Sequence, residues 1–249
     1  MNRVIVHLSR PGGVATLPNC PVCSAENLDF SIRCISCGSF LQQNVKTLDL
    51  FSTLYNTWRY PDFTLRKIIL AEHKNYTVLI AALEAIGCSF LALFFIKAAD
   101  IYTSDLWRLI TTGTALGLFV FLPAIYIFVI LSYLILRPGK RGVTLKGFIS
   151  GTVYSMHPLA FGAVVLLPAE IAIFGPYLFS NNPSPQVINP LPFYFLSFLD
   201  FAAVVISIIF LTRLANTMFG KKIRATVLSA VFVSVFAAAL EVAKKLLLK

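Results

Sequence analysis

The chain has 249 residues, of which 57% are hydrophobic and only 13% are charged. Soluble domains have about a quarter of their residues charged and fewer than half apolar, so this composition excludes a disordered chain, a disulfide-stapled mini-protein and an ordinary soluble enzyme. The formal net charge is +10, from 21 Lys and Arg against 11 Asp and Glu. The sequence therefore predicts an all-α, polytopic membrane protein with a basic surface.

The polar N-terminal segment, residues 1–46, holds a pair of cysteine motifs. Cys20, Cys23, Cys34 and Cys37 form two C-x₂-C motifs with ten residues between them. This spacing is typical of a zinc ribbon, in which four thiolates surround one Zn²⁺ ion. Two disulfides, a redox C-x-x-C and an iron–sulfur centre are the alternatives. We expect one structural Zn²⁺ that holds a small cytosolic head of short strands and knuckles, because four thiolates leave no open coordination position for catalysis.

Residues 47–76 form an amphipathic linker. Phe51, Tyr55 and Trp58 recur at helical spacing, and Pro61 interrupts the run. Aromatic side chains of this kind gather at the surface of a bilayer. We therefore expect an interfacial linker helix, and the alternative is a soluble helix that packs on the ribbon.

Residues 77–249 carry five apolar segments and predict a bundle of five transmembrane helices. Each segment is close to or longer than the roughly 20 residues that a helix needs to span a bilayer. Pro123 predicts a kink in the second segment, and Pro158 and Pro168 predict a bend in the third. The expected spans are residues 77–96, 109–136, 148–175, 191–212 and 225–243.

The loops between these segments differ in their basic charge. Residues 137–147 and 213–224 each hold four Lys and Arg, whereas residues 97–108 hold two and residues 176–190 hold none. Basic loops stay on the cytosolic side of a membrane. We therefore expect a cytosolic N-terminus in a prokaryotic cytoplasmic membrane. The basic loops serve as an orientation signal in this interpretation, so we expect no nucleic-acid partner.

Four ionisable residues interrupt the apolar segments, and such residues are functional candidates because charge is costly in hydrocarbon. Counting from the predicted cytosolic ends, Glu84, His157 and Asp200 fall at similar depth and form a candidate intramembrane polar cluster. Glu170 falls near the outer end of the third segment, where Lys97 could pair with it. The cluster predicts either a proton or ion relay or a set of hydrogen bonds between helices with protonated carboxyls.

Small residues at four-residue spacing, among them Gly113 and Gly117, predict close helix contacts. These contacts belong within the bundle or, as an alternative, to a homo-oligomer. The sequence lacks the phosphate-binding, metalloprotease and serine-hydrolase motifs. We therefore expect no catalytic residues and no enzyme; an intramembrane hydrolase that uses His157 with a carboxylate is the minor alternative.

Two local stretches carry a family resemblance. Residues 60–68, YPDFTLRKI, precede the first span, and residues 153–159, VYSMHPL, place a tyrosine and then a proline in the third. With the head and the closely spaced spans, they resemble the Yip family of membrane proteins, named for interacting with Ypt/Rab GTPases, in its prokaryotic form with an N-terminal zinc ribbon. The resemblance covers about residues 50–245. It implies an α-helical membrane bundle without established catalytic residues and a role in membrane organisation or trafficking.

The function that we expect from these features is non-enzymatic. A zinc-stabilised cytosolic head would dock a cytosolic or membrane protein partner, and a lipid-embedded bundle would hold it at the bilayer. The alternative is a small proton- or ion-coupled transporter or channel that uses Glu84, His157 and Asp200.

Overall fold

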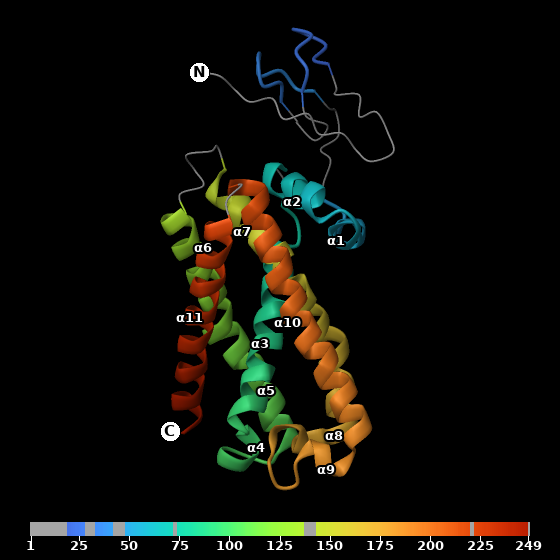
Figure 1. Ribbon diagram of the computed structural model, residues 1–249, viewed down its shortest axis with the longest axis vertical. Coiled ribbons are helices and arrows are strands. Elements are labelled where there is room, and N and C mark those ends of the chain that lie inside the picture. The colour runs from blue at the N-terminus through green and yellow to red at the C-terminus, as the bar shows by residue number, and fades with distance from the viewer. Residues whose placement is uncertain are drawn as a thin grey trace. The chain divides into compact units, whose positions relative to one another are not determined.

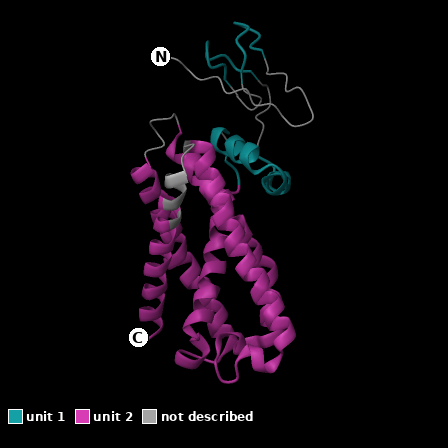
Figure 2. Cartoon of the chain, viewed as in Figure 1, with its two compact units in different colours: residues 1–75 teal, residues 76–249 magenta. Residues whose placement is uncertain are grey.

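The computed structural model describes residues 19–27, 33–41, 48–71, 74–136, 143–219 and 222–248, and the structural statements below concern these residues. The chain divides into two compact units, residues 1–75 and residues 76–249 (Figure 2).

The first unit contains the two cysteine motifs and two short helices, α1 (Leu50–Arg59) and α2 (Pro61–Leu70). Asp49 begins α1, where its Oδ2 accepts a hydrogen bond of 2.7 Å from the backbone N–H of Ser52. Pro61 opens α2 at a position where a helix has no use for the missing N–H. The linker thus forms two helices instead of one, since Pro61 fits the start of a helix better than its middle.

The second unit is a helical bundle in which four helical segments are long and apolar enough to cross a membrane. These are the segments Thr77–Ile96, Leu106–Leu136, Leu145–Phe179 and Pro190–Met218. Short helices α4 (Ala98–Ile101) and α9 (Pro185–Ile188) lie in the connections at one end of the unit (Figure 1). The prediction of an integral, mainly helical membrane protein is confirmed at this level.

The four segments are built from the following elements. The first is α3 (Thr77–Ile96), and the second joins α5 (Leu106–Leu116), η1 (Gly117–Phe121) and α6 (Leu122–Leu136). The third joins α7 (Leu145–Phe161), η3 (Gly162–Leu166), α8 (Leu167–Phe174) and the 3₁₀ turn η4 (Gly175–Phe179). The fourth is α10 (Pro190–Phe219).

The predicted fifth span lies in α11 (Lys222–Leu247), a helix of 26 residues. It packs against α10 and α6 and runs towards the end of the unit where α4 lies (Figure 1). The side chains of residues 222–226 and 229 lie outside the described part of the chain. A fifth crossing therefore stays a prediction.

Helix α3 is at the centre of the bundle and packs against α7, α5, η1 and α6. Glycines allow the closest approaches. A Cβ added to Gly117 would lie 2.8 Å from Cα of Ile86, and one added to Gly87 would lie 2.9 Å from the carbonyl oxygen of Leu159. Gly117 of the predicted small-residue stripe therefore makes a contact inside the bundle.

Two of the three prolines that predicted irregular helices follow π-helical turns. Leu122 N–H bonds to the carbonyl of Gly117, and Leu167 N–H bonds to the carbonyl of Gly162, five residues back in each case. Proline follows one residue later, at Pro123 and at Pro168. Proline lacks an N–H and its ring crowds the carbonyl four residues back, and the wider π turn relieves this conflict.

Candidate metal centre and intramembrane polar residues

The two cysteine motifs form two equivalent knuckles. In the first, the N–H of Ser24 donates to the carbonyl of Cys20 over 2.9 Å; in the second, the N–H of Gly38 donates to the carbonyl of Cys34 over 3.0 Å. Both turns end in the left-handed region, with φ of 57° at Ser24 and 73° at Gly38. Each turn brings its two thiols to one side of the backbone.

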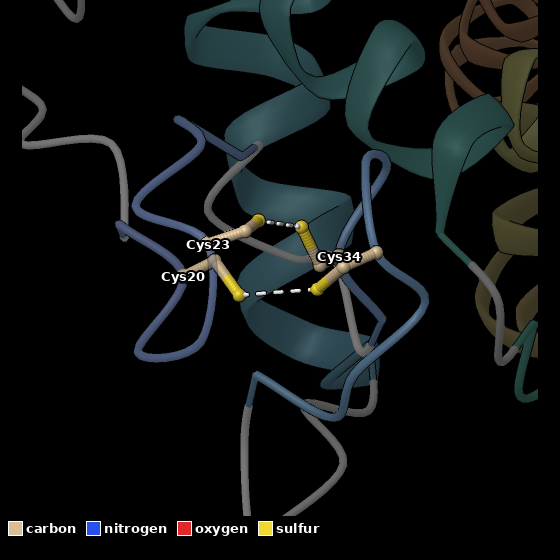
Figure 3. Close-up of side chains that lie close together, drawn as sticks. Cys20, Cys23 and Cys34 are labelled. Carbon is tan, nitrogen blue, oxygen red and sulfur yellow. Dashed lines mark hydrogen bonds between the residues drawn. The ribbon is translucent and has the colours of Figure 1, made fainter.

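The knuckles bring all four sulfurs to one centre. The Sγ atoms of Cys20, Cys23, Cys34 and Cys37 all lie within 4.8 Å of one another. Across the two knuckles, the Sγ atoms of Cys23 and Cys34 are 3.4 Å apart (Figure 3), and those of Cys20 and Cys37 are 3.6 Å apart. A tetrahedron of thiolates around a metal at about 2.3 Å has sulfurs roughly 3.8 Å apart. All four cysteines are free, so the centre can hold a metal ion.

Hydrogen bonds at this centre lower the pKa of two thiols, whereas the contact with the Cys34 thiol raises the pKa of the Cys23 thiol to about 11. The Ser39 hydroxyl lies 3.1 Å from the sulfur of Cys20 and lowers the pKa of that thiol to about 6. The backbone N–H of Cys37 lowers the pKa of the Cys34 thiol. A thiolate is the form that binds metal, so the bonds to Cys20 and Cys34 favour the metal-binding form of these two residues. Four thiolates would fill a tetrahedral site and leave no position for a substrate.

His157 has a structural partner within its own helix. Pro158 has no N–H to give to the carbonyl of Tyr154, four residues back. Nδ1 of His157 lies 2.7 Å from that carbonyl oxygen, which only accepts, so Nδ1 carries the proton. The ring also stacks on Phe210 of α10. This arrangement favours the structural alternative for His157, a hydrogen bond that repairs the gap left by proline.

Glu84 is fully buried in α3, and neither carboxyl oxygen has a hydrogen-bond partner in the described part of the chain. Two contacts between α3 and α7 lie on either side of Glu84 along the chain. Before it, the Thr77 hydroxyl is hydrogen-bonded to the Ser150 hydroxyl; after it, Gly87 packs on Leu159. Glu84 thus belongs to the level of α3 that runs along the second half of α7. A charge at this site would have no counter-charge, so the packing accommodates the neutral acid.

Asp200 lies against the third segment beside Glu170. A Cβ at Gly162 would lie 3.6 Å from Oδ1 of Asp200, and the side chains of Asp200 and Glu170 border the same cavity. The sequence analysis placed Asp200 with Glu84 and His157, and that cluster stays a prediction. Helix α10 continues to Phe219, seven residues past the predicted end of that span, so Asp200 lies farther from that end of its helix than predicted.

Counting from the other end of the bundle locates both carboxyls. Asp200 is ten residues from the start of α10 at Pro190, or ~15 Å along the helix. Glu170 lies four residues before the end of α8 at Phe174, or ~6 Å. Both carboxyls therefore lie in the half of their segments that is far from the basic loops.

Lys97, the predicted partner of Glu170, has other neighbours. Its Nζ lies 3.9 Å from the centre of the Phe94 ring, and Asp100 supplies the nearby negative charge. Asp100 in turn accepts hydrogen bonds from the Ser180 hydroxyl and from the N–H of Asn181. Within the described residues, the structure records no ion pair between Lys97 and Glu170.

The pair of carboxyls borders a cavity of about 300 Å³ between α3, the third segment and α10. Its walls are mostly aromatic and aliphatic, and Ser197 is the other polar residue. No sequence pattern indicated this cavity, since it depends on which helix faces meet.

Comparisons with protein families, curated proteins and solved structures were made with the whole chain. Nothing matches. The resemblance to the Yip family therefore stays a prediction from the sequence.

Proposed function

We propose that the chain is a non-enzymatic integral membrane protein whose zinc-stabilised head docks a protein partner beside the bilayer. The observation that carries the proposal is the convergence of four free thiols within 4.8 Å. Zn²⁺ is the ion that we propose, because four thiolates in a tetrahedron are one of its usual structural sites.

The head is too small to be held by a hydrophobic core. Its two knuckles span only residues 19–27 and 33–41 of the described chain, joined by isolated backbone bridges between Asn19 and Glu26 and between Arg33 and Phe40. A segment of this size generally needs a metal or disulfides to fold. Metal binding would therefore supply its folding free energy.

The head carries apolar side chains that it does not bury. Val22, Ile35 and Phe40, here called the head patch, are 72%, 66% and 65% exposed. Arg33 lies over the ring of Phe40, with 4.7 Å between its guanidinium carbon and the ring centre. Apolar anchors with a neighbouring arginine are typical of protein interfaces. We infer that the head patch contacts a protein surface with an apolar pocket and an acidic rim.

Helix α1 supports a position of the head at the bilayer surface. Phe51, Tyr55 and Trp58 are exposed and recur at spacings of four and three residues, whereas Thr53 and Thr57 are buried. An exposed aromatic face of this kind suits the headgroup region of a membrane. We propose that this face lies in the interface.

The orientation that we propose has the N-terminus in the cytosol of a prokaryotic cell. Residues 137–147 and 213–224 are basic in the sequence, and of these the structure describes Lys146 in the first turn of α7 and Arg213 near the end of α10, whereas residues 180–189 carry no charge. This asymmetry supports the positive-inside orientation. Together with the Yip-like features, it favours a role in membrane organisation.

A transporter remains the second candidate, favoured by the carboxyl-lined cavity. In that function Asp200 with Glu170 would bind the cargo, and Glu84 and His157 would lie on the neighbouring helices. Proton or ion flux into liposomes that disappears in Asp200→Asn would support it; no flux under any gradient would contradict it.

Site-specific photo-crosslinking in native membranes tests the docking proposal. A photoreactive residue at position 22 or 35 should capture one recurrent protein, and one at Val187, which is exposed in α9, should not. Cys34→Ser should abolish the adduct without reducing membrane insertion, because the head would lose its metal. Cys88→Ser is the matched control, since Cys88 is buried in α3, away from the metal centre. An adduct that persists in Cys34→Ser would refute the proposal.

A further inference from the structure

The intramembrane cavity has aromatic walls and an opening on the outside of the bundle. Five phenylalanines border it, and two of them, Phe95 of α3 and Phe201 of α10, are 70% and 67% exposed. Since both belong to apolar segments long enough to span a membrane, the opening between α3 and α10 would face lipid. A ligand could enter from the hydrocarbon layer.

The polar end of the cavity carries unbalanced charge. Glu170 and Asp200 both border the cavity, and two neighbouring carboxyls in a mostly apolar site cannot both be ionised, so the pair holds at least one proton. With a single shared proton the pair has a charge of −1. Among the described residues that border the cavity there is no Lys, Arg or His. A charge at such a depth needs a counter-ion.

We propose that this cavity binds a protonated lipophilic amine. The ammonium group has three N–H donors for the oxygens of Glu170 and Asp200 and would neutralise the pair. The apolar body of the ligand would pack on the phenylalanine rings, which also attract a cation. The cavity volume of about 300 Å³ lies at the lower end of known small-molecule pockets, which favours a small amine over a phospholipid.

This inference goes beyond the proposed docking function and does not depend on the head. Its evidence is confined to α3, the third segment and α10, whereas docking rests on the cysteine centre. A full-length Cys34→Ser variant should therefore bind the amine like the wild type, so the two proposals can fail separately.

Equilibrium dialysis of the full chain in lipid nanodiscs, corrected with empty nanodiscs, tests the proposal. The probes are 4-phenylbutylamine, which is protonated at pH 7, and the neutral 4-phenyl-1-butanol of nearly the same size. The amine should bind saturably to one site, and the alcohol should bind about ten- to a hundredfold more weakly, which is the difference expected for charge-assisted hydrogen bonds. Equal affinity of the two probes for the wild type would overturn the proposal without any variant.

Isosteric variants locate the site. Glu170→Gln combined with Asp200→Asn should weaken amine binding by at least about tenfold and leave alcohol binding unchanged. Glu241→Gln is the control, because Glu241 is an exposed carboxylate of α11. Unchanged amine binding by a double variant whose thermal midpoint is close to that of the wild type would refute the site. If the double variant does not fold, the same two probes are measured with Asp200→Asn alone, which should weaken amine binding and leave alcohol binding unchanged.

Discussion

Replacing Ser24 with glycine should tighten metal binding, although Ser24 is not a ligand. Its φ of 57° is left-handed, whereas Gly38 occupies the same place in the second knuckle with a φ of 73°. A left-handed backbone costs a side-chain-bearing residue roughly 1–2 kcal/mol. Glycine avoids this cost, but it loses more chain entropy on folding than other residues, which costs about 0.5–1 kcal/mol. The net gain of about 0.5–1 kcal/mol corresponds to a roughly two- to fivefold lower Kd, since 1.4 kcal/mol is a factor of ten.

The reverse change, Gly38→Ser, should weaken binding by a similar factor. A Cβ at position 38 meets no atom within 4 Å, so the effect reports the backbone alone. The assay is competition for Zn²⁺ with a chromophoric chelator, using the full chain in detergent. Ser36→Gly is the matched control, because Ser36 lies in the same knuckle without a positive φ, and it should bind no more tightly. If Ser24→Gly leaves the Kd unchanged or raises it, the equivalence of the two knuckles is wrong.

Three further outcomes are expected. Gly87→Ala should destabilise the bundle by about 1–3 kcal/mol, because its Cβ would lie 2.9 Å from the Leu159 carbonyl oxygen; thermal unfolding in detergent measures this, and a variant as stable as the wild type would argue against the close contact. His157→Phe should lower the free energy of unfolding by about 1 kcal/mol, because the hydrogen bond to the Tyr154 carbonyl is lost. The loss should be smaller in a Pro158→Ala protein, where the N–H of residue 158 can bond to that carbonyl. Equal losses with and without Pro158→Ala would contradict the role of His157 in replacing the missing bond. Acidification from pH 7 to about pH 4 should release the metal, because each bound thiolate takes a proton, and chelator fluorescence would follow the release.

The convergence of the four cysteines was predictable because it depends on local spacing. A C-x₂-C turn fixes where two thiols point, and the repetition from Cys20 to Cys37 supplies four of them. Hydropathy likewise located the four segments that can span a membrane, because length and composition suffice for that. The left-handed conformation of Ser24 was also predictable from a comparison of the two motifs, because Ser24 and Gly38 follow the second cysteine of each motif.

The polar pair in the bundle was not predictable, because it depends on helix ends and on π turns. Depths counted from predicted ends joined Asp200 to Glu84 and His157, which stays a prediction, whereas the cavity that Asp200 shares with Glu170 was not predicted. Both π turns follow a Gly-x₅-Pro spacing, from Gly117 and from Gly162, and change which side of the helix later residues occupy. That spacing is a local signal that could have indicated the shift.

Metal analysis of the purified full chain tests the central claim most directly. Elemental analysis should find one zinc ion per chain in the wild type and in Cys88→Ser, and none in a variant with Cys20 and Cys34 both changed to Ser. The same samples should show protease resistance of the head only where zinc is present. Protein without zinc, or with the visible absorption of an iron–sulfur centre in its place, would contradict the zinc-stabilised head.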